Sequence, residues 1–496
     1  MASLWRSLVV ALAVVALWAV LAHSRALFGQ AVPPENRPTP PKAETVPERI
    51  PEADEAFERF KARDWPSAVE LLQRAVKKNK NLPPAHVIMF QWFAQSGQGF
   101  LARMSLEQAV MSDPKDPEAI VILGNIALQE RRINDAELTF LKAEHLLKDF
   151  DKSPMRKGIL ELQTLSGLTN VDEAHERWKD AQAKLELLLQ LSPRDAMVMQ
   201  RLARALFQQG NAAESLKWLR KSKEVGGPDI LTPEAALAKF YEQYGDHRNA
   251  VVWMHKALDK APEDAATQLV AARWALEAGQ LDDFETHAVK GLQLATAELQ
   301  RVPEERSAQV MARLLNAKIL RGLAALFRKD YATAEKYFEA ARLQSPGNFA
   351  ATNNLALTLC EQTDEHTGQP DQAKLNRALE LVNANYKIDP RNPEINSTLG
   401  WVLYRAGMLA RAEDALRQAA SSGNVSPDTA YYLAQVSYDH DRRNRELAKN
   451  LLEAALNTPF FSMRAEAQTL LDKIKAEPPP KAEPLPKAVE KPKNAR

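Results

Sequence analysis

The chain has 496 residues, and 45% of them are hydrophobic, which is enough apolar material for a large core. Its 65 basic and 64 acidic residues nearly cancel, so no net field points to nucleic acid or to an anionic surface as partner. Cys360 is the single cysteine, which excludes an intramolecular disulfide and leaves stability to the core.

The first 31 residues have the pattern of an export signal or a membrane anchor. Arg6 precedes an unbroken apolar run over residues 8–22, and small residues at Gly29 and Ala31, or at Ala22 and Ser24, offer cleavage sites. As a helix the run would span about 22 Å, at about 1.5 Å per residue, which is less than a hydrocarbon core of about 30 Å. We therefore predict export with cleavage, to the periplasm or the medium. The alternative is a retained N-terminal helix that anchors the chain to a membrane.

Two proline-rich segments flank the rest of the chain. Residues 32–51 combine prolines with charged residues, and proline favours an extended backbone, so this segment is predicted to be a semi-rigid linker. Residues 477–496 are rich in proline and lysine and are predicted to form a disordered tail.

From residue 52 to about residue 457, one helix-turn-helix pattern recurs, and Pro393–Ala419 is its clearest copy. Leu399 and Gly400 share one face of the first helix, and Gly407 interrupts the pattern. The second helix carries a small, a large and a small residue on one stripe: Ala412, Leu416 and Ala419. The same triplet recurs with a following proline as Ala102, Leu106, Ala109, Pro114; as Ala250, Met254, Ala257, Pro262; as Ala334, Phe338, Ala341, Pro346; and without it as Ala136, Phe140, Ala143.

This unit resembles the tetratricopeptide repeat, a helix-turn-helix of about 34 residues with small and large residues in a fixed order. The resemblance implies an all-α, right-handed superhelical solenoid of about eleven such repeats over residues 52–457. Residues 458–476 are predicted to add the capping helix that a repeat array needs at its end.

Three stretches depart from the repeat pattern. The first half of the fourth unit, which begins near Met155, contains Ser166 and Gly167 and is expected to include a loop. The polar stretch Thr363–Gln372 lengthens the ninth unit and is predicted to loop out of the stack. A smaller insertion, Asp439–Asn444, is expected in the eleventh unit.

No motif in the sequence indicates catalysis, a cofactor or a metal. The nine histidines form no HExxH pattern, and a Gly-rich phosphate loop and a GxSxG motif are missing. Repeats and linkers account for nearly every residue, so we predict a protein that is not an enzyme. Cys360, at the end of a predicted helix, is interpreted as a packing residue rather than a nucleophile.

The first helices of tetratricopeptide repeats line a concave groove, and by that resemblance residues of three successive first helices are predicted to bind a partner. They are aromatic residues with polar ends, Arg, Asn and Gln, and the aromatic residues and Arg are types that anchor interfaces: Asn353, Asn354, Trp401, Tyr404, Arg405, Tyr431, Gln435 and Tyr438. The alternative is that Trp401 and Tyr404 only pack between neighbouring repeats. Asn125 and Asn354 match a clamp that grips a C-terminal carboxylate, but Glu394 and Thr398 stand where the clamp needs cations, so capture of a peptide terminus is not predicted.

These observations predict a non-catalytic scaffold or adaptor in the cell envelope, which binds a protein or peptide in the groove and no nucleic acid. The alternative is a subunit of an envelope machine that exports polysaccharide or assembles outer-membrane proteins, because residues 399–407 look like repeats of bacterial envelope and polysaccharide-export proteins. An enzyme is the third alternative. Contact with a membrane is expected only if the N-terminal segment is retained.

Overall fold

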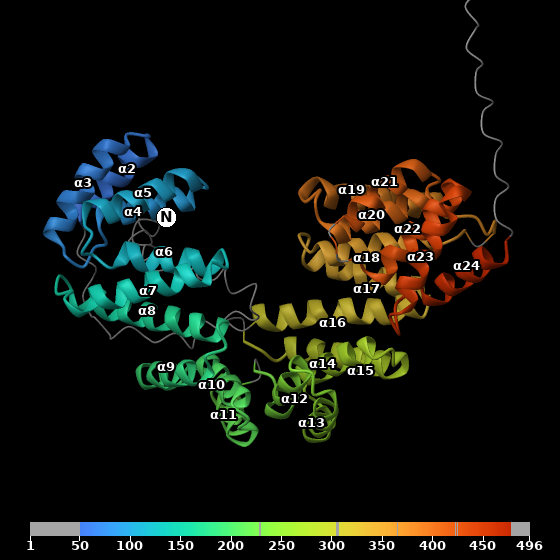
Figure 1. Cartoon of the computed structure of the whole chain (residues 1–496), viewed down its shortest axis with the longest axis horizontal. Helices are drawn as coiled ribbons and strands as arrows, with labels where there is room; N and C mark the ends of the chain where they lie inside the picture. The colour runs from blue at the N-terminus through green and yellow to red at the C-terminus, as the bar shows by residue number, and fades with distance from the viewer. Residues whose placement is uncertain are drawn as a thin grey trace, which may run out of the picture. The chain divides into compact units, whose positions relative to one another are not determined.

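The computed structural model describes residues 50–477, apart from 228–229, 304–306, 365, 422 and 424. Within these residues the chain forms 23 α-helices, α2 to α24, and no β-strand (Figure 1). Helices α2 to α23 follow one another as pairs, most of which are joined by a short turn, and α24 follows the last pair. The predicted all-α solenoid of about eleven helix pairs is confirmed.

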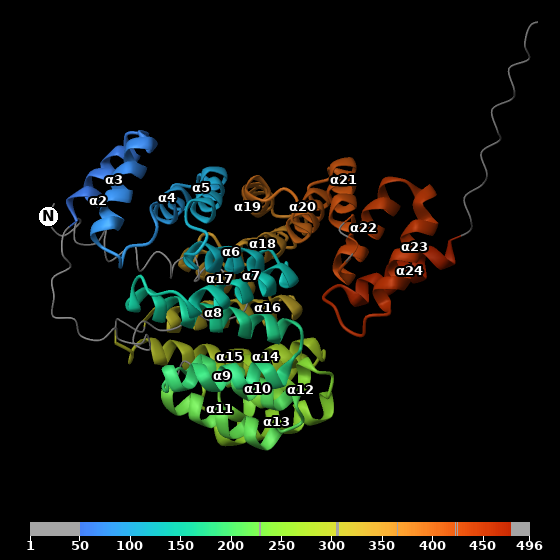
Figure 2. The ribbon, with the colours of Figure 1, turned by 60° about the vertical axis from the view of Figure 1, so that its left-hand side comes forward.

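The chain divides into two compact units, Met1–Ala257 (unit 1) and Leu258–Arg496 (unit 2). In both units most helices pack on the helix before and the helix after them, as in a stack of repeats (Figures 1 and 2). Unit 1 contains α2 (Pro51–Lys61), α3 (Trp65–Lys78), α4 (Ala85–Gln95), α5 (Gly99–Ser112), α6 (Glu118–Gln129), α7 (Ile133–Lys148), α8 (Pro154–Ala174), α9 (Trp178–Leu191), α10 (Ala196–Gln208), α11 (Ala212–Gly226) and α12 (Pro233–Gln243). The boundary between the units lies within the next helix, α13 (His247–Lys260). Unit 2 is built from α14 (Ala265–Glu277), α15 (Leu281–Leu299), α16 (Ser307–Phe327), α17 (Tyr331–Gln344), α18 (Phe349–Cys360), α19 (Gln372–Ile388), α20 (Pro393–Arg405), α21 (Leu409–Ala420), α22 (Pro427–His440), α23 (Arg445–Leu456) and α24 (Arg464–Ala476).

The small residues of the first helices lie against the large residues of the second helices. A Cβ atom on Gly124 of α6 would lie 2.8 Å from the Phe140 ring of α7. On Gly400 of α20 it would lie 2.5 Å from Cγ of Leu416, on α21. The large residue of each repeated triplet is buried together with its two small neighbours. The spacing found in the sequence therefore describes the close contact inside each helix pair.

Asx side chains and left-handed residues set where the helices begin and end. Asn392 Oδ1 accepts hydrogen bonds from the backbone N–H of Glu394 at 3.0 Å and of Ile395 at 3.3 Å, and so caps α20. Gly407, with φ +75°, closes the turn between α20 and α21. Lys329 takes the same left-handed conformation between α16 and α17, with φ +58°.

Of the three stretches that were expected to depart from the repeat pattern, the structure contradicts the first and contains the other two. The loop predicted in the first half of the fourth unit is wrong, because α8 runs unbroken through Gly167. A Cβ atom on Gly167 would lie 2.3 Å from the Phe140 ring, so this glycine allows close packing and does not break the helix. The ninth unit does carry a loop between α18 and α19, closed by a bridge between Thr363 and Pro370. In the eleventh unit α22 continues to His440, and a 3-10 turn at Arg442–Asn444 makes up the rest of the insertion.

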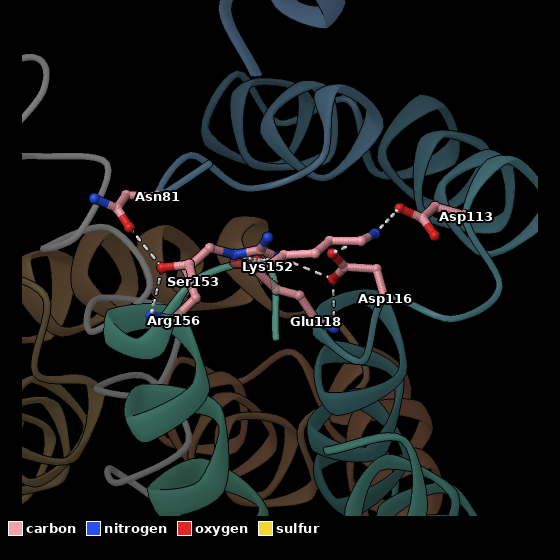
Figure 3. A network of polar contacts seen from close by, with 7 residues as sticks. All are labelled: Asn81, Asp113, Asp116, Glu118, Lys152, Ser153 and Arg156. Atoms are coloured by element: carbon pink, nitrogen blue, oxygen red, sulfur yellow. Dashed lines mark hydrogen bonds and ion pairs between the residues drawn. The ribbon is translucent and has the colours of Figure 1, made fainter. Parts of the chain in front are cut away.

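A buried charge network joins three loops of unit 1, each of which connects one helix pair to the next (Figure 3). The Arg156 guanidinium, in the first turn of α8, donates to Asp116 Oδ1 at 2.8 Å and to Glu118 Oε2 at 2.6 Å. Ser153 caps α8 and lies 2.5 Å from Oδ1 of Asn81. The network ties together the loops between α3 and α4, between α5 and α6, and between α7 and α8.

The charges at the centre of this network are buried, and cations lie against its two buried carboxylates. Asp116, Glu118 and Arg156 are all buried, and Lys152 adds a second cation 3.6 Å from Asp116 at the rim. Burial raises the pKa of Glu118, while the charge of Arg156 opposes that rise. Burial would lower the pKa of Arg156, but the charges of Glu118 and Asp116 outweigh it and the pKa is raised. No sequence motif indicated this network.

Several predicted segments lie outside the described residues. The N-terminal segment 1–31 and all of the linker 32–51 except its last two residues are among them, as is the tail after residue 477. Helix α24 (Arg464–Ala476) lies within the range 458–476 that was predicted to hold a capping helix. Among the helices that the structure describes, none is both long enough and apolar enough to cross a membrane.

Candidate functional site

The predicted binding residues lie on three first helices of unit 2 that pack side by side, α18 on α20 and α20 on α22. Helix α18 carries two of the eight, and α20 and α22 carry three each. Five of them come together in one patch, which we call the groove patch: Trp401, Tyr404, Arg405, Tyr431 and Gln435.

Trp401 forms the centre of the groove patch. Its ring stacks on Tyr404, with centroids 5.0 Å apart, and lies 5.7 Å from the Tyr431 ring. It also stacks on Tyr432 at 4.3 Å. Trp401 is only 4% exposed, so its ring packs inside the unit. Its Nε1 donates a hydrogen bond to Glu361 Oε1 at 2.7 Å, so the buried ring has a polar partner at the edge of the groove patch.

Two side chains converge on Asp439 from neighbouring helices. The Tyr404 hydroxyl donates to Asp439 Oδ2 at 2.7 Å, and Gln435 Nε2 donates to the same oxygen at 2.5 Å. Burial, followed by the hydrogen bond to Asp439, raises the pKa of Tyr404 well above its usual value. The Tyr404 hydroxyl therefore stays protonated and holds Asp439 in one position.

Arg405 connects the patch to the end of α18. Its Nε donates to the backbone oxygen of Cys360 at 3.2 Å, and its guanidinium lies 3.8 Å from Glu361. The side chains of Glu361 and Asp439 are 19% and 26% exposed. These two carboxylates remain in reach of solvent, while the rings of Trp401 and Tyr431 are buried. The sequence reasoning missed both residues, although each is an acidic residue at or beside the end of a first helix.

The other three predicted residues do not join the groove patch. Asn353 is buried, and its Oδ1 accepts from Asn385 Nδ2 at 2.7 Å inside the α18/α19 pair. Tyr438 is buried, its hydroxyl donates to Glu477, and the Arg442 guanidinium lies over its ring at 4.0 Å. Asn354 is half-buried. The partner-binding role of all eight residues stays a prediction.

Cys360 has the surroundings of a packing residue. It is 1% exposed, and its Sγ lies 3.2 Å from the Leu357 backbone oxygen. Burial raises the pKa of the Cys360 thiol well above its usual value, which disfavours the thiolate that a nucleophile needs. Among the residues described by the structure, no cluster of three or more His, Cys, Asp or Glu side chains is arranged to hold a metal ion.

The tetratricopeptide repeat family matches residues 170–228 and 319–365, which lie in unit 1 and in unit 2. Over 220 residues the chain is 30% identical to a TPR repeat-containing protein of Pseudomonas aeruginosa. That alignment covers 43% of this chain and 33% of the relative, so the chain spans about a third of the relative's length.

Solved structures are also similar to this chain. The yeast Tom70 structure has 13% identity, and the match covers 86% of this chain and 95% of that chain with a TM-score of 0.31. The APC/C hetero-tetramer Cut9-Hcn1 has 14% identity, 84% and 95% coverage, and a TM-score of 0.36.

Proposed function

Starting from the match of both units to the tetratricopeptide repeat family, we propose that this protein is a non-catalytic scaffold or adaptor that binds a polypeptide on the first helices of unit 2. The repeat fold itself suggests a protein-protein interaction scaffold. The observation that carries the proposal is the groove patch, in which three side chains donate to two partly exposed carboxylates, Glu361 and Asp439.

The groove patch has the properties of a preorganised binding surface. The carboxylates are held by Trp401, Tyr404 and Gln435, so a partner would not have to order them on binding. A carboxylate has about four acceptor positions, and both side chains therefore retain capacity for further donors. Lys or Arg side chains and backbone N–H groups of a polypeptide supply such donors, and the stacked rings form a rigid base beneath them.

The double variant Glu361→Gln, Asp439→Asn removes both charges and keeps the shape of the groove patch. We expect the variant to capture about one tenth or less of the amount of partner that the unchanged chain captures. A tenfold loss of affinity corresponds to about 1.4 kcal/mol of binding free energy. The measurement is quantitative mass spectrometry of proteins captured from extracts of the source cells. Far-UV circular dichroism checks that the variant is folded.

The matched control is Glu446→Gln, Glu453→Gln, which makes the same charge change on exposed positions of α23. We expect at least one protein to be captured by the unchanged chain and by the control but not by the groove-patch variant. Identical capture by all three chains would mean that the groove patch only packs. The identity of the partner also separates the adaptor from the alternative, a subunit of an envelope export or assembly machine.

We further propose that the protein works in the cell envelope, outside the cytoplasm. The support is the sequence pattern of Arg6 followed by the apolar run 8–22 and the linker 32–51. Cell fractionation and mass spectrometry of the N-terminus test the placement. A chain that begins shortly after residue 24 or residue 31 in the soluble envelope fraction indicates export with cleavage, and a full-length chain in the membrane fraction indicates an anchor. Recovery in the cytoplasm would contradict the placement.

A further inference from the structure

The residues between α23 and α24 (457–463, here the clasp segment) do not simply continue the stack. Phe460 of this segment stacks on Phe327, the last residue of α16, with ring centroids 5.2 Å apart and planes at 20°. Figures 1 and 2 show the clasp segment next to that end of α16. Repeats in a solenoid normally contact their neighbours in sequence, whereas this contact skips three intervening helix pairs.

The surface under Phe460 is shaped for an aromatic ring. Gly279, in the turn between α14 and α15, has φ +72°, and a Cβ atom there would lie 3.1 Å from the Phe460 ring. On its other side Phe327 meets the edge of Phe284, with centroids 6.5 Å apart and planes at 85°. The ring of Phe460 therefore lies in a slot between the half-buried backbone at Gly279 and the face of Phe327.

A cation stands beside the aromatic slot. Lys329, two residues after Phe327, donates from Nζ to Glu466 Oε1 at 2.5 Å. This hydrogen bond raises the pKa of Lys329 and keeps the ammonium charged. Glu466 lies in the first turn of α24, so the clasp segment and α24 together present one ring and one carboxylate to this surface.

The base of the clasp segment is held independently of the slot. Asp428 Oδ1 accepts from Ser462 Oγ at 2.5 Å and from the Met463 backbone N–H at 3.3 Å. Phe461, next to Phe460, is 6% exposed and packs in the terminal core. Across the slot there is one ring stack and one ion pair, and the Lys329 side chain is 63% exposed. Contacts of this kind are weak, so Phe460 can leave the slot while α23 and α24 stay folded.

We propose that the slot formed by Gly279, Phe327 and Lys329 is a docking site for a partner peptide that carries an aromatic side chain and a carboxylate, and that the clasp segment occupies it in the resting protein. The clasp segment itself shows the chemistry that the slot accepts. The inference rests on the proposed function, because it assigns the class of polypeptide partner and a contact that limits its access to unit 2.

The test uses the purified full chain and a fluorescein-labelled peptide of residues 457–467, NTPFFSMRAEA. Fluorescence anisotropy compares its affinity for the unchanged chain and for the opened variant Phe460→Ala, Glu466→Gln. We expect the opened variant to bind at least tenfold more tightly, because its own segment no longer competes. The matched control Glu453→Gln, on the exposed side of α23, should bind as weakly as the unchanged chain.

Two further measurements test the chemistry of the slot. Adding Lys329→Gln to the opened variant, or replacing the two corresponding positions of the peptide by Ala and Gln, should remove the gain in affinity. Equal affinity for the unchanged and opened chains overturns the proposal, and so does a gain that survives either change. If the double variant loses helicity, the single variant Phe460→Leu is titrated with the peptide instead. We expect an intermediate gain in peptide affinity, and no gain would contradict the proposal.

The peptide titration and the capture experiment can fail separately. A gain in peptide affinity together with unchanged capture by the Glu361→Gln, Asp439→Asn variant would support docking in the slot and contradict partner binding at the groove patch. Loss of a partner from that variant together with equal peptide affinities would support the proposed function and contradict docking in the slot.

Discussion

Replacing Arg156 with Met is expected to lower the free energy of unfolding by about 3–5 kcal/mol at neutral pH. The substitution leaves the carboxylates of Asp116 and Glu118 buried without the guanidinium that each contacts. Methionine fills most of the volume of the arginine stem, so the loss reports the missing charge rather than a cavity. Urea unfolding followed by far-UV circular dichroism measures the change.

The deficit of the Arg156→Met variant should shrink as the pH falls. Burial already raises the pKa of Glu118 above its ordinary value of 4.5, and removing Arg156 removes the charge that opposes this rise. A group whose pKa is higher in the folded state than in the unfolded state favours folding below the unfolded value and loses that contribution as the pH rises through the folded value. Unfolding curves at pH 5 and pH 7 should therefore show the smaller deficit at pH 5.

Arg59→Met is the matched control for this prediction. Arg59 also contacts two carboxylates, but its side chain is 51% exposed, and such surface pairs contribute about 0–1 kcal/mol. If Arg156→Met costs no more than Arg59→Met, the buried network does not stabilise the loops of unit 1.

Replacing Gly400 with Leu should destabilise the protein by about 1–3 kcal/mol through overpacking. A Cβ atom at this position would lie 2.5 Å from Leu416 Cγ and 3.0 Å from the backbone oxygen of Ala412. The backbone oxygen cannot move aside, so α20 and α21 must separate. The thermal unfolding midpoint, followed by circular dichroism, measures the effect.

The control for Gly400→Leu is Gly158→Leu in α8. Gly158 is exposed and its added Cβ atom would meet nothing within 4 Å, so the same gain in helix propensity comes without a clash. The midpoint of this variant should stay the same or rise. Equal midpoints for the two variants would show that the close approach inside the α20/α21 pair is not needed.

The helix pairs could be predicted from the sequence because their contacts are local and periodic. Gly400 and Leu416 lie on consecutive helices, and the spacing that places them together recurs along the chain. The error in α8 has the same source. A loop was expected in the stretch that contains Ser166 and Gly167, whereas the missing side chain of Gly167 makes room for the ring of Phe140 on the preceding helix.

The candidate site was predictable only in part. Trp401 and Tyr404 were recognised as a pair, but their hydrogen-bond acceptors were not, because Glu361 lies 40 positions before Trp401 and Asp439 lies 35 positions after Tyr404. The charge network of unit 1 joins loops by contacts 72 and 40 positions apart. Such pairings follow from how successive turns stack, and no periodic pattern in the sequence records them.

The contact of Lys329 with Glu466 bridges 137 positions, and it changes how unit 2 is expected to unfold. An open array of repeats frays from its ends, since each terminal repeat is held by one neighbour only. In unit 2 the segment before α24 is joined back to α16, so the C-terminal repeats cannot fray without releasing that link. The link consists of one ring stack and one ion pair, so it should delay the fraying of the C-terminal repeats until Phe460 leaves the slot.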